Sequence, residues 1–488
     1  MKKILVGLVS FFILASASAL HAANIGVPAE CEDVMLQAFY WDSYKTQSAT
    51  DSKFGRTKWM DLIKDTTEIR DNFDLVWFPP SAKSTGGVGY YHTQLSNQDS
   101  DWGTKTMLKN LIAGLHRGNT KVIADIVINH RGSVSGWCQF AKDNFGTYGS
   151  YQLTSKHVCK GDECFSDSRS DWYNKPDSVR GATDSGSNDS GARDLDHKSE
   201  YVQNWAKAYT QWILKTMAYD GFRYDMTLGY HGRYLKMYNE ASNPYISVSE
   251  LWDGITRQKQ HLQECDYNTM VFDFQQKYVL KKAFVQGGYG ALKKNTNSFR
   301  GQGLERYAVT FIDNHDTFDR GGTYGDNQFT NTTDLTNATA KNQVLQASAY
   351  LMMMPGIPCV FYPHWASYKE EIKELIAVRK RAGIHSESQV ITESSGQYKY
   401  TATVQGHRGQ VVIRVGKYRD MTVPEGFELA VEGGDRGDYT VYVKDEAQGI
   451  ANPSLTLPLR EGKKFVENGK LYIRHGEHVY DIFGRIIQ

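Results

Sequence analysis

The chain has 488 residues, a formal net charge of +1, 40% hydrophobic residues and 12% aromatic residues. This length exceeds that of an ordinary single domain, although one barrel domain can take about 250 residues or more. A near-neutral chain without a basic stripe does not favour nucleic acid or a membrane surface as a partner. We therefore expect a globular protein, and we expect it to be a monomer.

The first 23 residues are typical of a secretory signal peptide. Lys2 and Lys3 precede an apolar stretch over residues 4–20, and the small residues at 15–19 fit an A-x-A cleavage site. A retained membrane anchor is the alternative, but the stretch is short for a membrane span and ends in small residues. The sequence therefore predicts a secreted protein, extracellular or periplasmic, with no membrane span after processing. Attachment at the cell surface stays open.

Six cysteines follow this segment: Cys31, Cys138, Cys159, Cys164, Cys265 and Cys359. Export would make disulfides chemically possible, and Cys159 and Cys164 are near enough in sequence to close a small loop. A zinc site is the weaker alternative, because the spacing does not match paired CxxC motifs and no histidine pair accompanies it. Cys359 lies in an apolar run and is expected to be a buried free thiol. The sequence does not fix the pairing.

Eight short apolar runs predict the strands of a parallel barrel. Each run is continuous, as expected for strands that are buried on both faces. They cover residues 34–41, 74–80, 121–130, 221–225, 245–250, 269–274, 307–316 and 357–362. Amphipathic patterns at residues 108–115, 202–213 and 372–379 predict helices between or after them. This alternation predicts an α/β fold, a (β/α)8 TIM barrel.

Two segments interrupt or follow the predicted barrel of residues 24–130 and 201–388. Residues 131–200 are rich in Gly, Ser, Asp and Asn, and they are too many for a loop, so we expect an inserted irregular subdomain after strand 3. Short alternating strands predict a C-terminal antiparallel β-domain over residues 389–448. Residues 449–488 are expected to form a terminal tail that contains a hairpin.

Polar side chains end four of the predicted strands, and parallel strands bring such ends to one rim of a barrel. These residues are Asn129 and His130, Asp225, Glu250, and His315 with Asp316. Arg223 lies two residues before Asp225 and therefore on the same face of its strand. A single strand-end aspartate is more often a helix cap than a catalyst, but several together favour an active site. Carboxyl groups and an arginine at one rim fit a glycosidase that acts on a sugar acetal.

The segments DIVINHR, GFRYDM, SELWD and FIDNHD resemble the characteristic regions of the α-amylase family, glycoside hydrolase family 13. The resemblance covers nearly the whole chain up to about residue 448. The segments GLHRGNTKVIADIVINHR, ARDLDH and KEEIKELIAVRKRAGIHSES are similar to the plant-type branch of that family. The terminal tail resembles the sorting tails of secreted proteins from Bacteroidetes-type bacteria, which implies a secreted bacterial protein.

The resemblance implies that Asp225 is the nucleophile, Glu250 the general acid/base and Asp316 the transition-state stabiliser. A retaining glycosidase needs one ionised carboxylate and one carboxylic acid, held about 5 to 5.5 Å apart. Arg223 is expected to keep Asp225 ionised and oriented. Glu250 must begin the reaction protonated so that it can donate to the leaving oxygen.

The resemblance also implies substrate contacts. His130 and His315 resemble the histidine pair that hydrogen-bonds sugar hydroxyls, and Tyr90 resembles the tyrosine that stacks on glucose beside the scissile bond. Three further aromatic residues end or follow predicted strands and either extend this surface or pack the rim: Trp41, Trp252 and Tyr362.

A structural Ca²⁺ is a further implication of the resemblance, because in this family one calcium joins the insert to the barrel. The ligands implied here are Asn129, Asp184, Asp189, Asp194 and the backbone carbonyl of Gly229. Hard oxygen ligands of this kind suit Ca²⁺. Such a clamp is reasonable since the insert has too little apolar surface to dock by itself. The alternative is an ordinary solvated acidic loop.

The resemblance therefore implies a calcium-dependent, retaining α-amylase that cleaves internal α-1,4 bonds of starch and related α-glucans. One alternative is a family relative that acts on maltooligosaccharides or α-1,6 links, or by transglycosylation. The other is a non-catalytic glucan-binding protein, against which the complete set of carboxyl groups argues. Leu228 stands where many members carry Lys or Arg, which leaves the affinity for the leaving-group side open.

Overall fold

The computed structural model describes residues 24–45, 51–175, 180–188, 191–293, 297–318, 327–417, 422–434, 437–446, 463–467, 470–475 and 478–480. The predicted signal peptide and Asp189 lie outside the described residues. The chain divides into two units, residues 1–444 and 445–488. Within the described parts of the chain, no helix combines the length and the apolar character that a membrane span requires.

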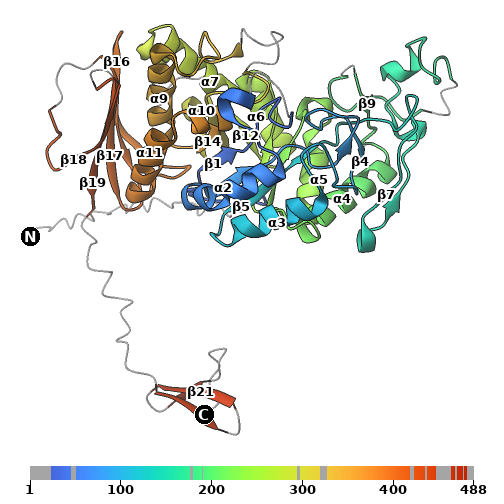
Figure 1. Ribbon diagram of the computed structural model, residues 1–488, viewed down its shortest axis with the longest axis horizontal. Coiled ribbons are helices and arrows are strands. Elements are labelled where there is room, and N and C mark those ends of the chain that lie inside the picture. The colour runs from blue at the N-terminus through green and yellow to red at the C-terminus, as the bar shows by residue number, and fades with distance from the viewer. Residues whose placement is uncertain are drawn as a thin grey trace, which may run out of the picture. The chain divides into compact units, whose positions relative to one another are not determined.

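The core of the first unit is a closed barrel of eight parallel strands in the order β1-β14-β13-β12-β11-β10-β5-β2 (Figure 1). The strands are β1 Met35–Gln37, β2 Leu75–Trp77, β5 Lys121–Ile126, β10 Gly221–Tyr224, β11 Ser247–Ser249, β12 Met270–Phe272, β13 Ala308–Phe311 and β14 Ile357–Phe361. All eight predicted strands are confirmed. They are shorter than predicted, because the apolar runs continue into the loops at their carboxyl ends, as at residues 127–130 after β5.

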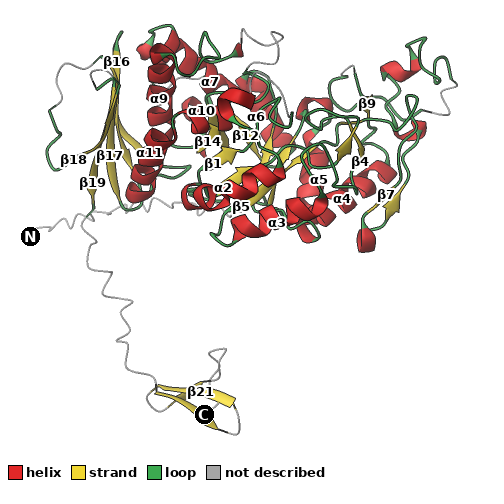
Figure 2. Cartoon of the chain, in the orientation of Figure 1, coloured by secondary structure: helices red, strands yellow, loops and turns green. Residues whose placement is uncertain are grey.

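Helices surround this barrel, as the red ribbons of Figure 2 show. They are α1 Asp51–Phe54, α2 Trp59–Asn72, α3 Lys105–His116, α4 Glu200–Lys215, α5 Gly232–Ser242, α6 Ile255–Glu264, α7 Phe274–Leu280, α8 Phe299–Gln302, α9 Ala338–Met353, α10 Tyr362–Ser367 and α11 Lys369–Ala382. Local sequence sets their ends. Thr104 caps α3 by accepting from the backbone N–H of Met107, and Gly383 ends α11 with a φ of +69°. The predicted helices α3, α4 and α11 are confirmed.

The insert after β5 consists mainly of loops with short pairings (Figure 2). Its strands are β6 His130–Arg131, β7 Asp143–Asn144, β8 Ser150–Tyr151 and β9 Arg193–Asp194, and an earlier loop forms β3 Lys83–Ser84 with β4 His92–Gln94. Strand β6 pairs with β9, so the end of the insert returns to the rim of the barrel. Arg131 Nη1 donates to Asp143 Oδ2 over 2.9 Å, and α4 contributes the Trp205 Nε1 donor to the same carboxylate. This buried polar contact anchors the irregular insert on α4.

An antiparallel sheet follows the barrel and confirms the predicted C-terminal β-domain. Its order is β15-β16-β17-β19-β18, with bounds Val390–Ser395, Lys399–Gln405, Gly409–Gly416, Tyr439–Asp445 and Glu428–Gly433. It lies against α9 and α11 (Figure 1). The second unit contains the sheet β20 Lys463–Glu467, β21 Lys470–His475 and β22 His478–Tyr480, so the predicted terminal hairpin is present.

Candidate active site

Two neighbouring barrel strands place an arginine opposite an aspartate. In the register of β5 and β10, Arg223 is the partner of Asp125. Asp225 follows β10 directly, and Glu250 follows β11 directly. The backbone N–H groups of Asp225 and Glu250 still bond to carbonyls of the adjacent strands, over 3.0 and 2.9 Å. The four side chains therefore stand at the carboxyl rim on rigid backbone.

The guanidinium of Arg223 holds three carboxylates. Nη1 donates to Asp125 Oδ1 over 2.9 Å and to Asp225 Oδ1 over 2.8 Å. Nη2 lies 2.8 Å from Glu250 Oε2. Arg223 is 1% exposed, so water does not compete for these contacts. The structure thus brings together Asp225, Glu250 and Arg223, as the sequence analysis expects.

Asp125 is a site residue that the sequence analysis did not single out. Besides Arg223, it accepts hydrogen bonds from Trp77 Nε1 over 3.1 Å and from Tyr90 Oη over 3.0 Å. The side chain is fully buried. The sequence does contain a signal for Asp125, an acidic residue inside an otherwise apolar strand. A buried carboxylate requires a polar or charged partner, so such a residue indicates a polar cluster. Naming that partner required the register of β5 and β10.

Burial dominates the electrostatics of this cluster. It raises the pKa of Asp225 well above its usual range, with repulsion from Glu250, Asp125 and Asp316 adding to the effect and Arg223 opposing it. Burial likewise raises the pKa of Asp125 to about 6, against the attraction of Arg223. The sequence predicts that Arg223 keeps Asp225 ionised and oriented. One guanidinium faces three carboxylates here, so the charges of these groups depend on one another.

The loop after β13 supplies His315 and Asp316. His315 lies between Gln37 Nε2, 2.9 Å from its Nδ1, and Tyr90 Oη, 2.6 Å from its Nε2. Asp316 Oδ2 is 3.1 Å from His315 Nε2. His130, on β6, has its Nε2 3.0 Å from the carbonyl oxygen of Tyr90. Both predicted histidines and Tyr90 are therefore part of one polar network beside the carboxylates.

The three further rim aromatics differ in their surroundings. Trp41 is stacked on the Tyr90–His315 pair, with ring centroids 6.2 and 6.1 Å away. Trp252 stacks on a phenylalanine of α7 with a centroid distance of 4.7 Å. Tyr362 is buried against the protein. Of the three, Trp41 is the one that adjoins the carboxylate cluster through these contacts.

The proposed calcium ligands converge at the base of the insert. Asn129 and Asp194 are buried, with Asn129 Nδ2 3.4 Å from Asp194 Oδ1. A Cβ atom on Gly229 would lie 1.8 Å from Asn129 Oδ1, so the amide of Asn129 meets the backbone of Gly229. Asp184 and Asp194 both act on the thiol of Cys159 and raise its pKa, after burial as the main cause. Four of the five predicted ligands therefore lie around one region.

These residues fit a calcium ion in their chemistry. They offer amide, carboxylate and carbonyl oxygens, the hard ligands that Ca²⁺ prefers. Asp162, which the sequence analysis did not name, lies behind them with its Oδ2 accepting from the backbone N–H of Asp194 over 2.8 Å. Burial raises the pKa of Asp162 to about 6. A buried carboxylate that orients Asp194 is the kind of outer support that metal ligands need.

A different group of potential metal ligands lies elsewhere in the first unit. Glu30, His385 and His407 bring their ligand atoms within 4.8 Å of one another. The two imidazole rings are stacked, with centroids 4.1 Å apart and an interplanar angle of 12°. Parallel stacked rings direct their in-plane lone pairs side by side, so this arrangement does not point both nitrogens at one ion.

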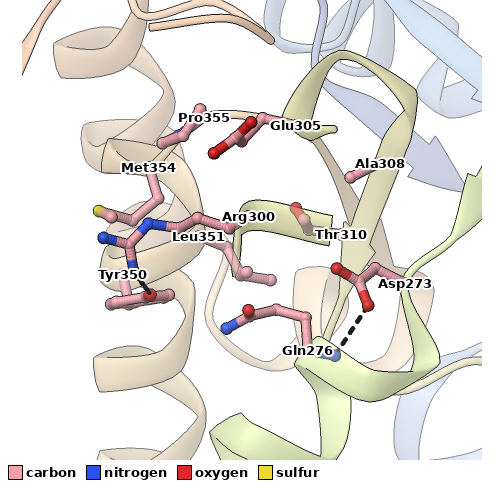
Figure 3. Close-up of a pocket in the computed structure, with 10 residues that line it drawn as sticks. All are labelled: Asp273, Gln276, Arg300, Glu305, Ala308, Thr310, Tyr350, Leu351, Met354 and Pro355. Carbon is pink, nitrogen blue, oxygen red and sulfur yellow. Dashed lines mark hydrogen bonds between the residues drawn. The ribbon is translucent and has the colours of Figure 1, made fainter. Parts of the chain in front are cut away.

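Figure 3 shows a small pocket that is separate from the carboxylate cluster. It lies beside α7, α8, α9 and β13. Asp273 caps α7 there by accepting from the backbone N–H of Gln276 over 2.9 Å, and Arg300 contacts Tyr350. Asp273 and Arg300 are thus tied to a helix end and to a neighbouring side chain, and we assign this pocket a packing role.

Comparison with known proteins identifies the family. Residues 69–392, more than half of the chain, match the family model for the α-amylase catalytic domain. The chain belongs to the α-amylase family. It is 30% identical over 406 residues to probable alpha-amylase 2 of Arabidopsis thaliana, an alignment that covers 76% of this chain and 86% of that relative. It is 29% identical over 430 residues to chloroplastic alpha-amylase 3 of the same plant, covering 83% of this chain but 43% of that longer relative. Both are plant proteins, which confirms the resemblance to the plant-type branch.

Solved α-amylase structures share the fold. An α-amylase from Anoxybacillus has a TM-score of 0.60 at 16% identity, covering 86% of this chain and 99% of that chain. The α-amylase of Geobacillus thermoleovorans, solved with acarbose, has a TM-score of 0.59 at 16% identity with the same coverage. At this identity the likeness supports the barrel architecture of this α-amylase-family chain.

Proposed function

We propose that this α-amylase-family enzyme hydrolyses internal α-1,4-glucosidic bonds of starch-like α-glucans with retention of configuration. The observation that carries the proposal is the set of three carboxylates on the buried guanidinium of Arg223, at the carboxyl rim of the barrel. Relatives named alpha-amylase along most of the chain support the same activity.

The residues divide the work as a double displacement. The carboxylate of Asp225 attacks the anomeric carbon while Glu250 gives its proton to the glycosidic oxygen, which leaves as an alcohol. A glycosyl ester on Asp225 results. Glu250 then removes a proton from water, the water oxygen attacks the same carbon, and the Asp225 carboxylate is released. Asp316 stabilises the positive charge that develops on the sugar in both steps.

Repulsion between the carboxyl groups accounts for the division of roles. Negative charge on Glu250 is the largest repulsion acting on Asp225, after burial and the opposing attraction of Arg223. A proton on Glu250 removes that repulsion and leaves Asp225 facing the guanidinium. Protonation of one group therefore favours ionisation of the other, as acid and nucleophile require.

The polar network beside the carboxylates supports sugar binding. The Tyr90 ring, which is stacked with the rings of Trp41 and His315, offers an apolar face, and the histidines carry nitrogens that suit hydroxyl groups. The contact of Tyr90 Oη with Asp125 also fixes the aromatic platform relative to Arg223. We assign glucose binding beside the scissile bond to Tyr90, His130 and His315.

We assign a structural role to calcium. Asn129, Asp184, Asp189, Asp194 and the carbonyl of Gly229 would hold the ion. When bound, calcium supplies folding stability by joining the insert to the barrel. Burial of Asn129 and Asp194 and the close contact of Asn129 with Gly229 support this assignment. Secretion and a monomeric state stay predictions of the sequence.

The experiment that tests the function compares the wild type with Glu250→Gln on soluble starch. We expect viscosity to fall ahead of reducing-sugar release, which indicates internal cleavage. We expect Glu250→Gln to lower kcat by roughly 10²- to 10⁴-fold, the usual contribution of a general acid/base. Glu240→Gln, on the outer helix α5 and paired with Lys236, is the matched control and should retain activity. Starch binding without turnover by the wild type would instead support a glucan-binding protein.

A further inference from the structure

Two thiols meet inside the insert. Cys138 Sγ and Cys164 Sγ are 3.3 Å apart, although the residues are 26 positions apart in sequence. The sequence analysis considered a loop closed by Cys159 and Cys164. The structure brings Cys164 to Cys138 instead, and Cys159 lies against Asp184. The S–S bond of a disulfide is about 2.05 Å long, so the two sulfur atoms must approach each other by about 1.3 Å to form it.

Both sulfur atoms are enclosed by protein. Cys138 is 4% exposed and Cys164 is fully buried. The hydrogen bond between them and burial raise the pKa of the Cys164 thiol, so the folded protein keeps it protonated. A thiolate is the species that reacts in disulfide exchange. The bond must therefore form before the insert closes over the pair.

The contacts argue against a metal ion between the two sulfurs. A stable thiolate site usually takes four ligands. Among the residues that the structure describes, the one group of three or more His, Cys, Asp or Glu ligand atoms within 4.8 Å is the Glu30 group, which contains no cysteine. Two thiols that belong to no such group fit a covalent bond to each other better than a metal site.

We propose that Cys138 and Cys164 form an intramolecular disulfide when the chain is exported. The two thiols lose two protons and two electrons, one S–S bond forms, and the disulfide of a protein thiol–disulfide oxidoreductase is reduced to a dithiol. The crosslink joins two irregular stretches of the insert, the loop around Cys138 and the 3₁₀ helix Glu163–Phe165. It restricts the unfolded insert and thereby stabilises the folded one.

The crosslink is adjacent to the proposed calcium site. The backbone N–H of Cys164 donates to Asp162 Oδ1 over 2.8 Å, and Asp162 Oδ2 accepts from the backbone N–H of Asp194 over 2.8 Å. One carboxylate therefore connects the disulfide to a proposed calcium ligand. This consequence rests on the proposed function, whereas the disulfide itself does not.

The test is to map the thiols of the full chain after export to the periplasm of a bacterial host. The protein is unfolded in guanidinium with an alkylating reagent, without reduction, digested and analysed by mass spectrometry. We expect Cys138 and Cys164 in one linked peptide pair, lighter by two hydrogens than the two thiol peptides, and alkyl groups on the other four cysteines. Alkylation of all six, a link between Cys159 and Cys164, or zinc retained in native mass spectra would overturn the proposal.

A second measurement addresses the energetic effect. We expect a reducing agent to lower the Tm of the wild type by several degrees and to leave the Tm of Cys138→Ser unchanged. Cys159→Ala is the matched control, and its Tm should fall on reduction as that of the wild type does. The difference is taken within each variant, so any loss of stability from the substitution cancels. Equal responses of wild type and Cys138→Ser would contradict the proposal. If the disulfide is intact but calcium no longer raises the Tm, the result argues against the calcium site and not against the disulfide.

Discussion

A single buried residue, Asp125, determines how the catalytic cluster is organised. Its carboxylate accepts hydrogen bonds from Arg223 Nη1, Trp77 Nε1 and Tyr90 Oη, and it thereby orients these three side chains. It also contributes to the raised pKa of Asp225. We therefore expect Asp125 to be a positioning residue whose charge acts on Asp225, the proposed nucleophile, through space and through Arg223.

Asp125→Asn should reduce activity in a pH-dependent manner. The pKa of Asp125 is raised to about 6, so above that pH the wild type carries a negative charge that the variant lacks. Below about pH 6 both side chains are neutral, and the difference should shrink. We expect a loss in kcat of about 10²-fold at pH 8, in the range for a misplaced catalytic group, and a smaller loss at pH 5. The measurement is the pH–rate profile of both proteins on soluble starch.

Asp143→Asn is the control for this prediction. Asp143 forms a buried ion pair with Arg131 in the insert and also accepts from Trp205, so the same chemical change is made at a similar contact. Asp143→Asn should lower the stability of the protein, but its activity relative to the wild type should not change with pH. If the kcat of Asp125→Asn relative to the wild type is constant between pH 5 and pH 8, the charge of Asp125 has no part in the reaction.

At the scale of elements, local patterns in the sequence were enough to predict the barrel and its rim. The eight strands are continuous apolar runs, and strand ends place Asp225 and Glu250 at the rim. The insert could not be derived in this way, since its contacts are non-local: His130 on β6 pairs with Asp194 on β9. The partner of Cys164 and the role of Asp162 depend on those same long-range contacts and were therefore missed.

The junction between the insert and the short helix Thr227–Gly229 allows a prediction about calcium. A methyl group at Gly229 would lie 1.8 Å from Asn129 Oδ1, so Gly229→Ala must displace the amide of Asn129. A ligand at 100 times its Kd stabilises the folded state by about 2.7 kcal/mol. We expect calcium to raise the Tm of the chelator-treated wild type and to leave that of Gly229→Ala nearly unchanged.

Gly254→Ala serves as the matched substitution, because a Cβ atom there meets nothing within 4 Å and the φ angle is −68°. It should respond to calcium as the wild type does. The same rise in Tm for Gly229→Ala would place the ion elsewhere. If the wild type itself gives no rise, the calcium assignment is wrong.

At the scale of the whole molecule, buried histidines contribute to the response to acid. Burial lowers the pKa of His197 to about 4 and the pKa values of His261 and His364 to about 3. In the unfolded chain a histidine titrates near 6.5. Between these values each of these histidines binds a proton in the unfolded state that it excludes in the native state, so its own contribution to stability falls as the pH decreases from about 6.5. Buried carboxyl groups with raised pKa values, such as Asp125 and Asp162, act in the opposite direction.

The variant His261→Gln tests the effect of one buried histidine on stability in acid. The His261 side chain contacts Ser249 Oγ over 3.0 Å, and a glutamine amide can keep that contact. Each excluded proton changes the free energy of unfolding by about 1.4 kcal/mol per pH unit. Chemical denaturation between pH 6 and pH 4 gives the slope of the free energy of unfolding against pH. This slope should be smaller in the variant by the amount that corresponds to about one proton. His116→Gln is the control, since a hydrogen bond to Asp220 raises the pKa of His116 and its contribution is lost only as the pH rises above about 6.5. Its slope between pH 6 and pH 4 should therefore match that of the wild type. An unchanged slope for His261→Gln would mean that His261 takes up its proton without unfolding the protein.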